Sequence, residues 1–367
     1  MNPTPRQRWP PSPLVQAGSR VSGRDDDGTG TDDEARPLIP EIDVEACLLD
    51  TQPASRCQSC VDVCPSGAWL FDGIELTLDA GLCDGCRFCV PACPEAAIVM
   101  LRDGAISDPW RRSGETAHMT CEYREKAVGR AFAACPHAYG IRDVAELHEN
   151  GIRRLVIDLG DCDTCERGGG LRLEKTVESF NALLADRGGS PVELAYGPFS
   201  GYGEDSPDLE RRRFLRGSVR NITSNLLADG GLDPIRRVLR TRGDGTPVRR
   251  FLNVPRIDTA LCNGCCVCAR LCPHSALSED SDGGGVALSV IPELCTGCKV
   301  CIDTCEETAI VVERMSVARN TWIPLRRLVC ESCGAPFDFP EVRVDHDSVC
   351  PTCRRKEHPA SPGRLAV

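Results

Sequence analysis

Aromatic residues are scarce in this chain of 367 residues, since phenylalanine, tyrosine and tryptophan together make up only 5% of it. With so few large side chains, apolar burial alone is a weak source of stability for each domain. Long apolar runs are also missing: residues 96–101 form one of the longest, far short of the about 20 residues of a membrane-spanning helix. Prolines interrupt the N-terminal residues where the apolar core of a secretory signal would lie, so we predict neither a membrane span nor an export signal.

The chain has no excess of basic residues. Its 43 lysines and arginines are outnumbered by 54 acidic residues, which gives a net charge of −11. A nucleic-acid-binding protein would be basic, so the balance disfavours that class while remaining compatible with a basic docking partner. The six histidines are scattered, no Ser/His/Asp or paired-carboxylate arrangement is visible, and the glycines at 168–170 lack the Lys-Ser/Thr of a phosphate loop.

Cysteine, in contrast, is abundant, with 25 residues in a chain far too long for a small disulfide-stabilised scaffold. Without an export signal we expect a cytoplasmic, reducing location, where clustered cysteines are more often metal ligands than disulfides. The binding energy of a metal also contributes to folding. Bound metal is therefore expected to organise several parts of this chain.

The composition changes along the chain and predicts an α+β protein in several modules. The expected ranges are a disordered tail (1–40), a first dicluster segment (41–110), a middle α/β cysteine segment (115–202), a basic helical linker (203–250), a second dicluster segment (251–318), a C-terminal zinc ribbon (325–358) and a tail (359–367).

An internal repeat lies in the two dicluster segments. Three runs have the spacing C-x2-C-x2-C-x3-C, and proline follows the last cysteine in the first two but Glu306 in the third. A fourth run is stretched, because nine residues separate its first two cysteines. The stretched run is Cys47, Cys57, Cys60 and Cys64; the others are Cys83, Cys86, Cys89 and Cys93; Cys262, Cys265, Cys268 and Cys272; and Cys295, Cys298, Cys301 and Cys305.

This spacing is that of bacterial ferredoxins. Three close cysteines on a tight loop can reach three corners of one 4Fe–4S cube, and the fourth, beyond the loop, points to the neighbouring cluster. The glycine before the second cysteine, as in Gly264, lets the backbone turn and bring amides near sulfur. Zinc knuckles or disulfides are the alternatives, which the repetition of the motif disfavours.

Both dicluster segments thus resemble two-cluster bacterial ferredoxin domains, including those of accessory proteins for molybdenum reductases. The resemblance implies pseudo-symmetric β-α-β halves and four 4Fe–4S clusters. Cys266 is surplus; it could replace Cys265, although the spacing favours Cys265. The implied ligand sets are Cys47, Cys57, Cys60 and Cys93; Cys83, Cys86, Cys89 and Cys64; Cys262, Cys265, Cys268 and Cys305; and Cys295, Cys298, Cys301 and Cys272.

Two C-x2-C hooks near the C-terminus, Cys330 with Cys333 and Cys350 with Cys353, can close a tetrahedral metal site. Residues 337–339 and 342–344 are predicted as short strands between them. The segment resembles zinc ribbons and also rubredoxin, in which four thiolates hold iron. We favour structural zinc because rubredoxin's aromatic core is lacking.

The middle segment contains Cys121, Cys135, Cys162 and Cys165. Apolar spacing predicts a helix at 143–150, a buried strand within 151–160, a helix at 171–187 and a strand at 192–196, hence a small parallel α/β layer. The segment loosely resembles the delta subunit of methyl-viologen-reducing hydrogenases, which implies a fifth iron–sulfur cluster. Core cysteines and a reactive Cys162/Cys165 dithiol remain as alternatives.

The predicted function is one-electron transfer through these clusters to or from a partner oxidoreductase, with no membrane or nucleic-acid partner and no substrate site of its own. The basic run at 211–216 is interpreted as a solvated helix or a docking surface. A maturation factor that delivers clusters is the alternative. A redox enzyme that uses the middle-segment cysteines is a third hypothesis.

Overall fold

The computed structural model describes residues 39–102, 105–106, 111–121, 135–167, 172–198, 234–240, 249–280, 286–319, 321–343 and 348–357. The chain divides into two compact units, residues 1–34 and 35–367, and every described residue belongs to the second. Most of the expected N-terminal tail, most of the basic linker with its run at 211–216, and the C-terminal tail lie outside the described residues. The described part mixes short helices with strands, so the expected α+β class is confirmed at that level.

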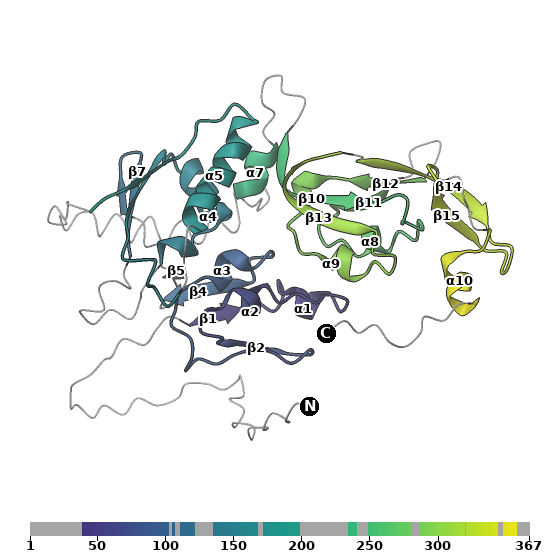
Figure 1. The fold of residues 1–367 in the computed structure, drawn as a ribbon, viewed down its shortest axis with the longest axis horizontal. Helices are drawn as coiled ribbons and strands as arrows, with labels where there is room; N and C mark the ends of the chain where they lie inside the picture. Colours follow the sequence, from purple (N-terminus) through teal and green to yellow (C-terminus); the bar gives the residue numbers. More distant parts are fainter. Residues whose placement is uncertain are drawn as a thin grey trace. The chain divides into compact units, whose positions relative to one another are not determined.

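The first dicluster segment contains a three-stranded antiparallel sheet and a separate two-stranded hairpin (Figure 1). Strand β1 (Pro40–Ile42) pairs with β4 (Ile98–Arg102), which also pairs with β5 (Ala105–Ile106), and β2 (Trp69–Phe71) pairs with β3 (Leu76–Leu78). Short helices lie within the cysteine runs. They are α1 (Leu48–Thr51), α2 (Ser59–Val63) and α3 (Cys89–Ala92).

The second dicluster segment repeats this arrangement. Its outer strands β10 (Arg250–Ile257) and β13 (Ile310–Val317) pair antiparallel, as do β11 (Leu277–Asp280) and β12 (Val286–Val290), which lie between the two cysteine runs. In both segments, one pair joins the first and last strands and the other is the central hairpin. The helical turns are α8 (Val267–Arg270), η3 (Pro292–Leu294) and α9 (Val300–Asp303).

The C-terminal ribbon shares a sheet with the second dicluster segment. Strand β14 (Trp322–Val329) pairs with both β12 and β15 (Pro336–Pro340), giving the order β11-β12-β14-β15, and α10 (Pro351–Glu357) follows. The sheet therefore crosses the boundary expected between residues 318 and 325.

The predicted strand at 342–344 is wrong in the part that is described. Val342 and Arg343 follow the end of β15 and belong to no strand, while residue 344 lies outside the described residues. Strand β14, which precedes the first hook, takes the pairing position instead. It buries Ile323 and Leu325, and β15 ends at Pro340, which has no N–H to continue a ladder.

The middle segment forms a four-stranded sheet in sequence order. Its strands are β6 (Arg111–Ser113), β7 (Thr116–Thr120), β8 (Arg154–Asp158) and β9 (Glu193–Tyr196), and β7, β8 and β9 are parallel. The other elements are η1 (Pro136–Ala138), α4 (Ile141–Glu149) and α5 (Arg172–Ala185). Helix α7 (Pro234–Arg240), from the range expected as the linker, joins their core.

The expected helices and strands of the middle segment are confirmed, with somewhat different ends. Helix α4 begins two residues early because the carboxylate of Asp143 accepts the N–H of Gly140 at 2.7 Å. Leu155 and Ile157 of β8 and Phe180 of α5 are fully buried in one core, which extends to Val254 in β10.

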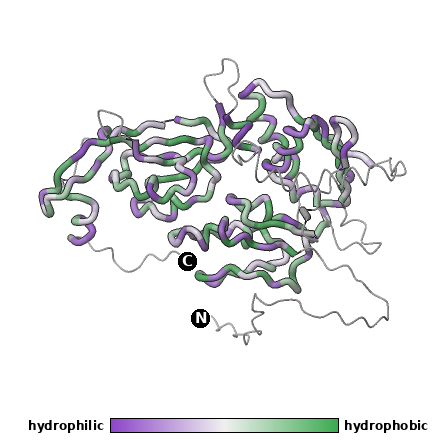
Figure 2. Tube along the Cα trace, turned by 180° about the vertical axis from the view of Figure 1, so that it is seen from behind, coloured by the Kyte–Doolittle hydropathy of each residue, from purple (hydrophilic) through white to green (hydrophobic). Residues whose placement is uncertain are grey.

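Apolar and polar residues alternate at short intervals along the coloured part of the tube in Figure 2. Accordingly, each helix in the described ranges is too short or too polar to traverse a lipid bilayer.

A close backbone approach links the ribbon to a cysteine loop. Gly264 has a φ of +73°, and a Cβ atom added to it would lie 2.3 Å from the carbonyl oxygen of Asp338 in β15. Glycine is required here for two reasons, the left-handed conformation and the lack of space.

Replacing Gly264 by alanine should therefore destabilise the chain more than replacing Gly67. Gly67 is also left-handed, with a φ of +63°, but a Cβ there would meet nothing within 4 Å. In both variants the free energy of unfolding should fall by about 1–2 kcal/mol because of the left-handed conformation. In G264A it should fall further, because β15 must move to make room for the Cβ atom. Thermal unfolding of anaerobically prepared protein measures the difference; equal losses would contradict the close contact.

Candidate metal centres

Sixteen cysteines of the two dicluster segments gather around four cavities. Each cavity is lined by the first three cysteines of one run and the last cysteine of its partner run, which is the crossed grouping that the ferredoxin resemblance implies; Cys266 lines cavity three in addition. Cavity one is lined by Cys47, Cys57, Cys60 and Cys93; cavity two by Cys64, Cys83, Cys86 and Cys89; cavity three by Cys262, Cys265, Cys266, Cys268 and Cys305; and cavity four by Cys272, Cys295, Cys298 and Cys301.

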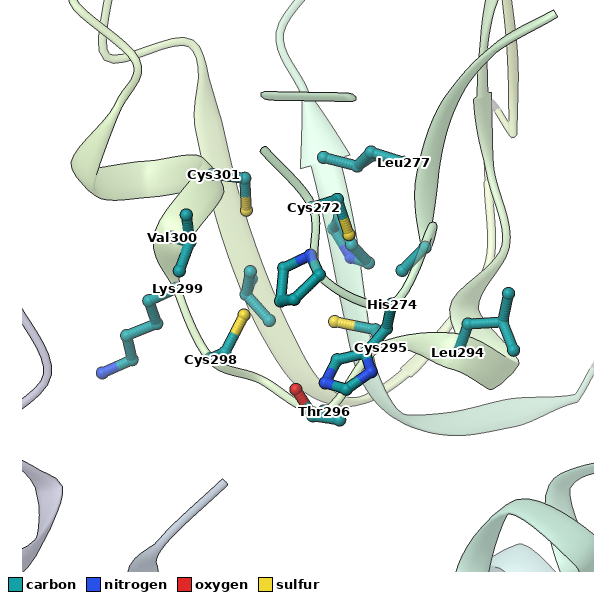
Figure 3. A pocket seen from close by; sticks show the side chains of 14 residues that line it. Cys272, His274, Leu277, Leu294, Cys295, Thr296, Cys298, Lys299, Val300 and Cys301 are labelled. Atoms are coloured by element: carbon teal, nitrogen blue, oxygen red, sulfur yellow. The ribbon is translucent and has the colours of Figure 1, made fainter. Parts of the chain in front are cut away.

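Figure 3 shows the thiols around cavity four directed toward a common space. Four thiols are the donor set of a 4Fe–4S cluster, one for each iron. His274 also lines cavity four, and its Nε2 lies 2.6 Å from Oε2 of Glu95. The residues around the cavities fit this group.

Backbone amides point at the first thiol of each loop. The N–H of Gly264 lies 3.4 Å from the sulfur of Cys262. Burial raises the pKa of Cys295 to about 12, and the amide of Gly297, at the equivalent position, opposes that rise. Amides in these positions stabilise negative charge on sulfur.

A second amide contact repeats at the fourth cysteine of a run. The N–H group four residues further on donates to its sulfur at 3.3 Å in three of the runs: Ala68 to Cys64, Ala97 to Cys93, and Ala309 to Cys305. The contact is the same where Glu306 replaces proline after Cys305. Proline at that place is therefore not required for this hydrogen bond.

The loop conformation distinguishes Cys265 from its neighbour Cys266. The residue after the second cysteine is left-handed in the three loops of regular spacing, with φ of 70° at Arg87, 56° at Cys266 and 64° at Lys299. Cys266 thus occupies the position of Arg87 and Lys299, which are not cysteines. Its buried thiol donates to the carbonyl of Gly264 at 3.3 Å. The repeat places Cys265 at the position of the second ligand.

Several thiols in the cavities are buried. Burial raises the pKa of Cys60 and Cys268 to about 12 and that of Cys89 to about 11. A thiol with a raised pKa stays protonated unless a cation replaces the proton. These side chains are therefore arranged to bind metal with release of protons, and poorly arranged to stay charged without it.

The C-terminal hooks form a much tighter group. The sulfurs of Cys330, Cys333, Cys350 and Cys353 all lie within 4.8 Å of one another, and those of Cys333 and Cys350 are 3.9 Å apart. Four thiolates around one tetrahedral zinc ion at about 2.3 Å would be about 3.8 Å apart. The N–H of Cys350, with those of Cys333 and Ser332, lowers the pKa of Cys330 to about 6, which favours the thiolate.

The middle segment brings its four cysteines together at one end of its parallel strands. Cys121 directly follows β7, Cys162 and Cys165 follow β8, and Cys135 precedes η1. Cys121 and Cys165 each lie close enough to Cys162 and Cys135 to add to the rise in thiol pKa that burial causes in both. The carboxyl ends of parallel strands are where α/β folds place their sites.

The middle cysteines do not form a group as tight as the C-terminal hooks. Among the described residues, the C-terminal hooks are the only group of three or more potential ligands whose atoms all lie within 4.8 Å. Four thiols from separate elements are also a possible donor set for an iron–sulfur cluster, whose ligands bind different metal atoms.

Two residues near the middle cysteines were not predicted from the sequence. His137 is 4% exposed, its Nε2 lies 3.5 Å from the sulfur of Cys162, and its Nδ1 accepts the N–H of Leu173 at 3.4 Å. Arg167 is 5% exposed and binds Asp84 in the loop of cavity two. His137 and Arg167 each follow a cysteine by two residues, and this was the signal from which they could have been predicted.

Comparison with known proteins supports the iron–sulfur assignment for one of the runs. The 4Fe-4S binding domain family matches residues 76–99, which contain Cys83, Cys86, Cys89 and Cys93. No curated protein matches the chain. The chain therefore carries a 4Fe–4S binding domain and is ferredoxin-like in this part.

The adjacent pair Cys265 and Cys266 provides a matched test of the ligand assignment. C265A should lose about four irons per chain, while C266A should keep the full iron content, because only Cys265 occupies the repeated ligand position. Iron and sulfide analysis of anaerobically prepared protein measures this. The assignment is overturned if C266A is the variant that loses iron.

Replacement of Cys353 by alanine should abolish a zinc content of about one per chain and leave the iron content unchanged. S348A is the matched control, since Ser348 lies two residues before Cys350 of the same hook and its hydroxyl donates to Glu331 at 2.7 Å. Elemental analysis decides the metal: one additional iron instead of zinc in the wild type would indicate a rubredoxin-like site.

Proposed function

We propose that this chain is a polyferredoxin that passes single electrons through four 4Fe–4S clusters, one in each of cavities one to four, to or from a partner oxidoreductase. The observation that carries the proposal is the crossed grouping of sixteen thiols around four cavities. The match to the 4Fe-4S binding domain supports an iron–sulfur electron-transfer role.

An iron–sulfur cluster supplies reversible one-electron chemistry when it is bound. The protein contributes positions, low polarity and hydrogen bonds. Amides of Gly264 and Ala97 lie within 3.4 Å of cysteine sulfur, and such contacts favour the more negative, reduced state. Cys60 and Cys89, which line neighbouring cavities, share one buried core with Trp69 and Ile98, so little separates the two sites.

The burial of these thiols favours resident clusters over cluster delivery. Cys268 and Cys301 are buried in one core with Leu277 and Leu288. Removing a cluster from such a site would leave a cavity and protonated thiols in the core, which costs stability. A delivery factor would instead need ligands that open readily to solvent.

Two further metal sites belong to the proposal. Zinc in the C-terminal ribbon would be structural, because four thiolates leave no open position for a substrate. An iron–sulfur cluster held by Cys121, Cys135, Cys162 and Cys165 would extend the electron path into the middle segment.

Anaerobic titration should show that the protein takes up and returns electrons without losing iron. Cys89→Ala should lose about four irons and the corresponding part of the electron capacity, because one ligand of cavity two is removed. C266A is the control that keeps all proposed ligands. Visible bleaching and electron paramagnetic resonance measure the electron uptake.

The competing hypothesis of cluster delivery makes the opposite prediction. After mixing with an apo-ferredoxin and separation, iron should remain on this chain and should not appear on the acceptor. Transfer of iron to the acceptor, together with irreversible reduction, would overturn the electron-transfer proposal.

A further inference from the structure

A buried arginine connects the middle cysteines to the loop of cavity two. Arg167 lies two residues after Cys165, and only 4% of its side chain is exposed. Its Nε donates to Oδ2 of Asp84 at 2.6 Å and its Nη2 to the carbonyl of Asp84 at 2.9 Å. Because Asp84 lies between Cys83 and Cys86, one side chain joins two ligand loops.

The charge of Arg167 acts on thiols at both sites. The guanidinium is bound to Asp84, which lies between Cys83 and Cys86, and Arg167 follows Cys165 by two residues, so its charge lies beside both sets of cysteines. Arginine remains charged at any accessible pH. It therefore stabilises negative charge both around cavity two and at the middle cysteines.

The two sites also pack directly against each other. Gly140 approaches so closely that an added Cβ would lie 2.5 Å from the Cβ of Pro91 in α3. The guanidinium of Arg172 lies over the ring of Phe88, 4.6 Å from its centroid. Cys86 and Cys135, which are candidate ligands of the two sites, belong to one buried cluster together with Phe88 and Ala138.

We propose that cavity two and the middle cysteines form a direct electron-transfer junction, and that Arg167 is the positioning residue that raises the reduction potential on both sides of it. The inference rests on the proposed function, because both sites need their clusters. An electron that crosses the junction oxidises the donor cluster by one electron and reduces the acceptor by one; no bond forms or breaks, and no proton moves.

The contact between the sites is tested on the wild-type chain reduced with dithionite. Two paramagnetic clusters that lie next to each other interact magnetically, so their resonance lines should be split. C162A should remove iron from the middle site and collapse this splitting, while C266A should preserve it. A wild-type spectrum without any interaction assignable to the middle site overturns the junction.

The role of Arg167 is tested by redox titration of each signal. R167Q should lower the reduction potentials of the middle cluster and of the cluster in cavity two, each by about 59 mV. This shift corresponds to a tenfold change in the equilibrium constant of a one-electron reduction. R167K keeps the charge and should remain closer to the wild type. R343Q is the matched control, because Arg343 donates to the carbonyl of Cys262 in cavity three, at 3.3 Å, and should leave both potentials unchanged.

The outcomes separate the two proposals. Full iron loading with both potentials unchanged in R167Q would overturn the role of Arg167. If C162A keeps the full iron content and the other clusters are reduced reversibly, the junction is overturned and the polyferredoxin proposal stands. Absence of reducible iron from the whole chain would overturn the proposed function itself.

Discussion

Burial of cysteine sulfur is the constraint on which the rest of this structure depends. The chain has few aromatic residues, and the centres of its dicluster segments contain thiols where other proteins of this size have large apolar side chains. Buried thiols with raised pKa values are poor anions by themselves. The fold and its metal content are therefore linked: the loops create the cavities, and bound metal compensates for the charge that the thiolates would otherwise leave in the interior.

The chain gathers sulfur in two structurally different ways. In the dicluster segments and the ribbon, short hooks present two or three cysteines from one tight turn, so local sequence determines most of the site. In the middle segment, Cys121 and Cys162 lie at the ends of two parallel strands, and the sheet itself brings them together. The first kind of site can be predicted from spacing, whereas the second depends on a packed α/β core.

This difference explains how much could be predicted from the sequence. The repeated spacing and the ferredoxin resemblance predicted which cysteines share a cavity, and apolar periodicity predicted α4, β8, α5 and β9 in the middle segment. Two features could not be predicted. The pairing of β14 with β12 joins strands of two segments that the sequence separates, and the ion pair of Arg167 with Asp84 joins residues 83 positions apart. Neither leaves a local signal, because each depends on how separately folded elements meet.

The continuous sheet from β11 to β15 has a mechanical consequence. The hairpin of β11 and β12 lies between the two cysteine runs of the second dicluster segment, and β14 extends it to the first hook of the ribbon. Asp338 in β15 lies against Gly264, and Arg343 holds the carbonyl of Cys262. Strain or loss of order at the C-terminal hooks would thus be transmitted along hydrogen-bonded strands to the walls of cavity three. The described ribbon residues, 322–343 and 348–357, would therefore support the wall of cavity three and unfold together with it, rather than form an appendage with a stability of its own.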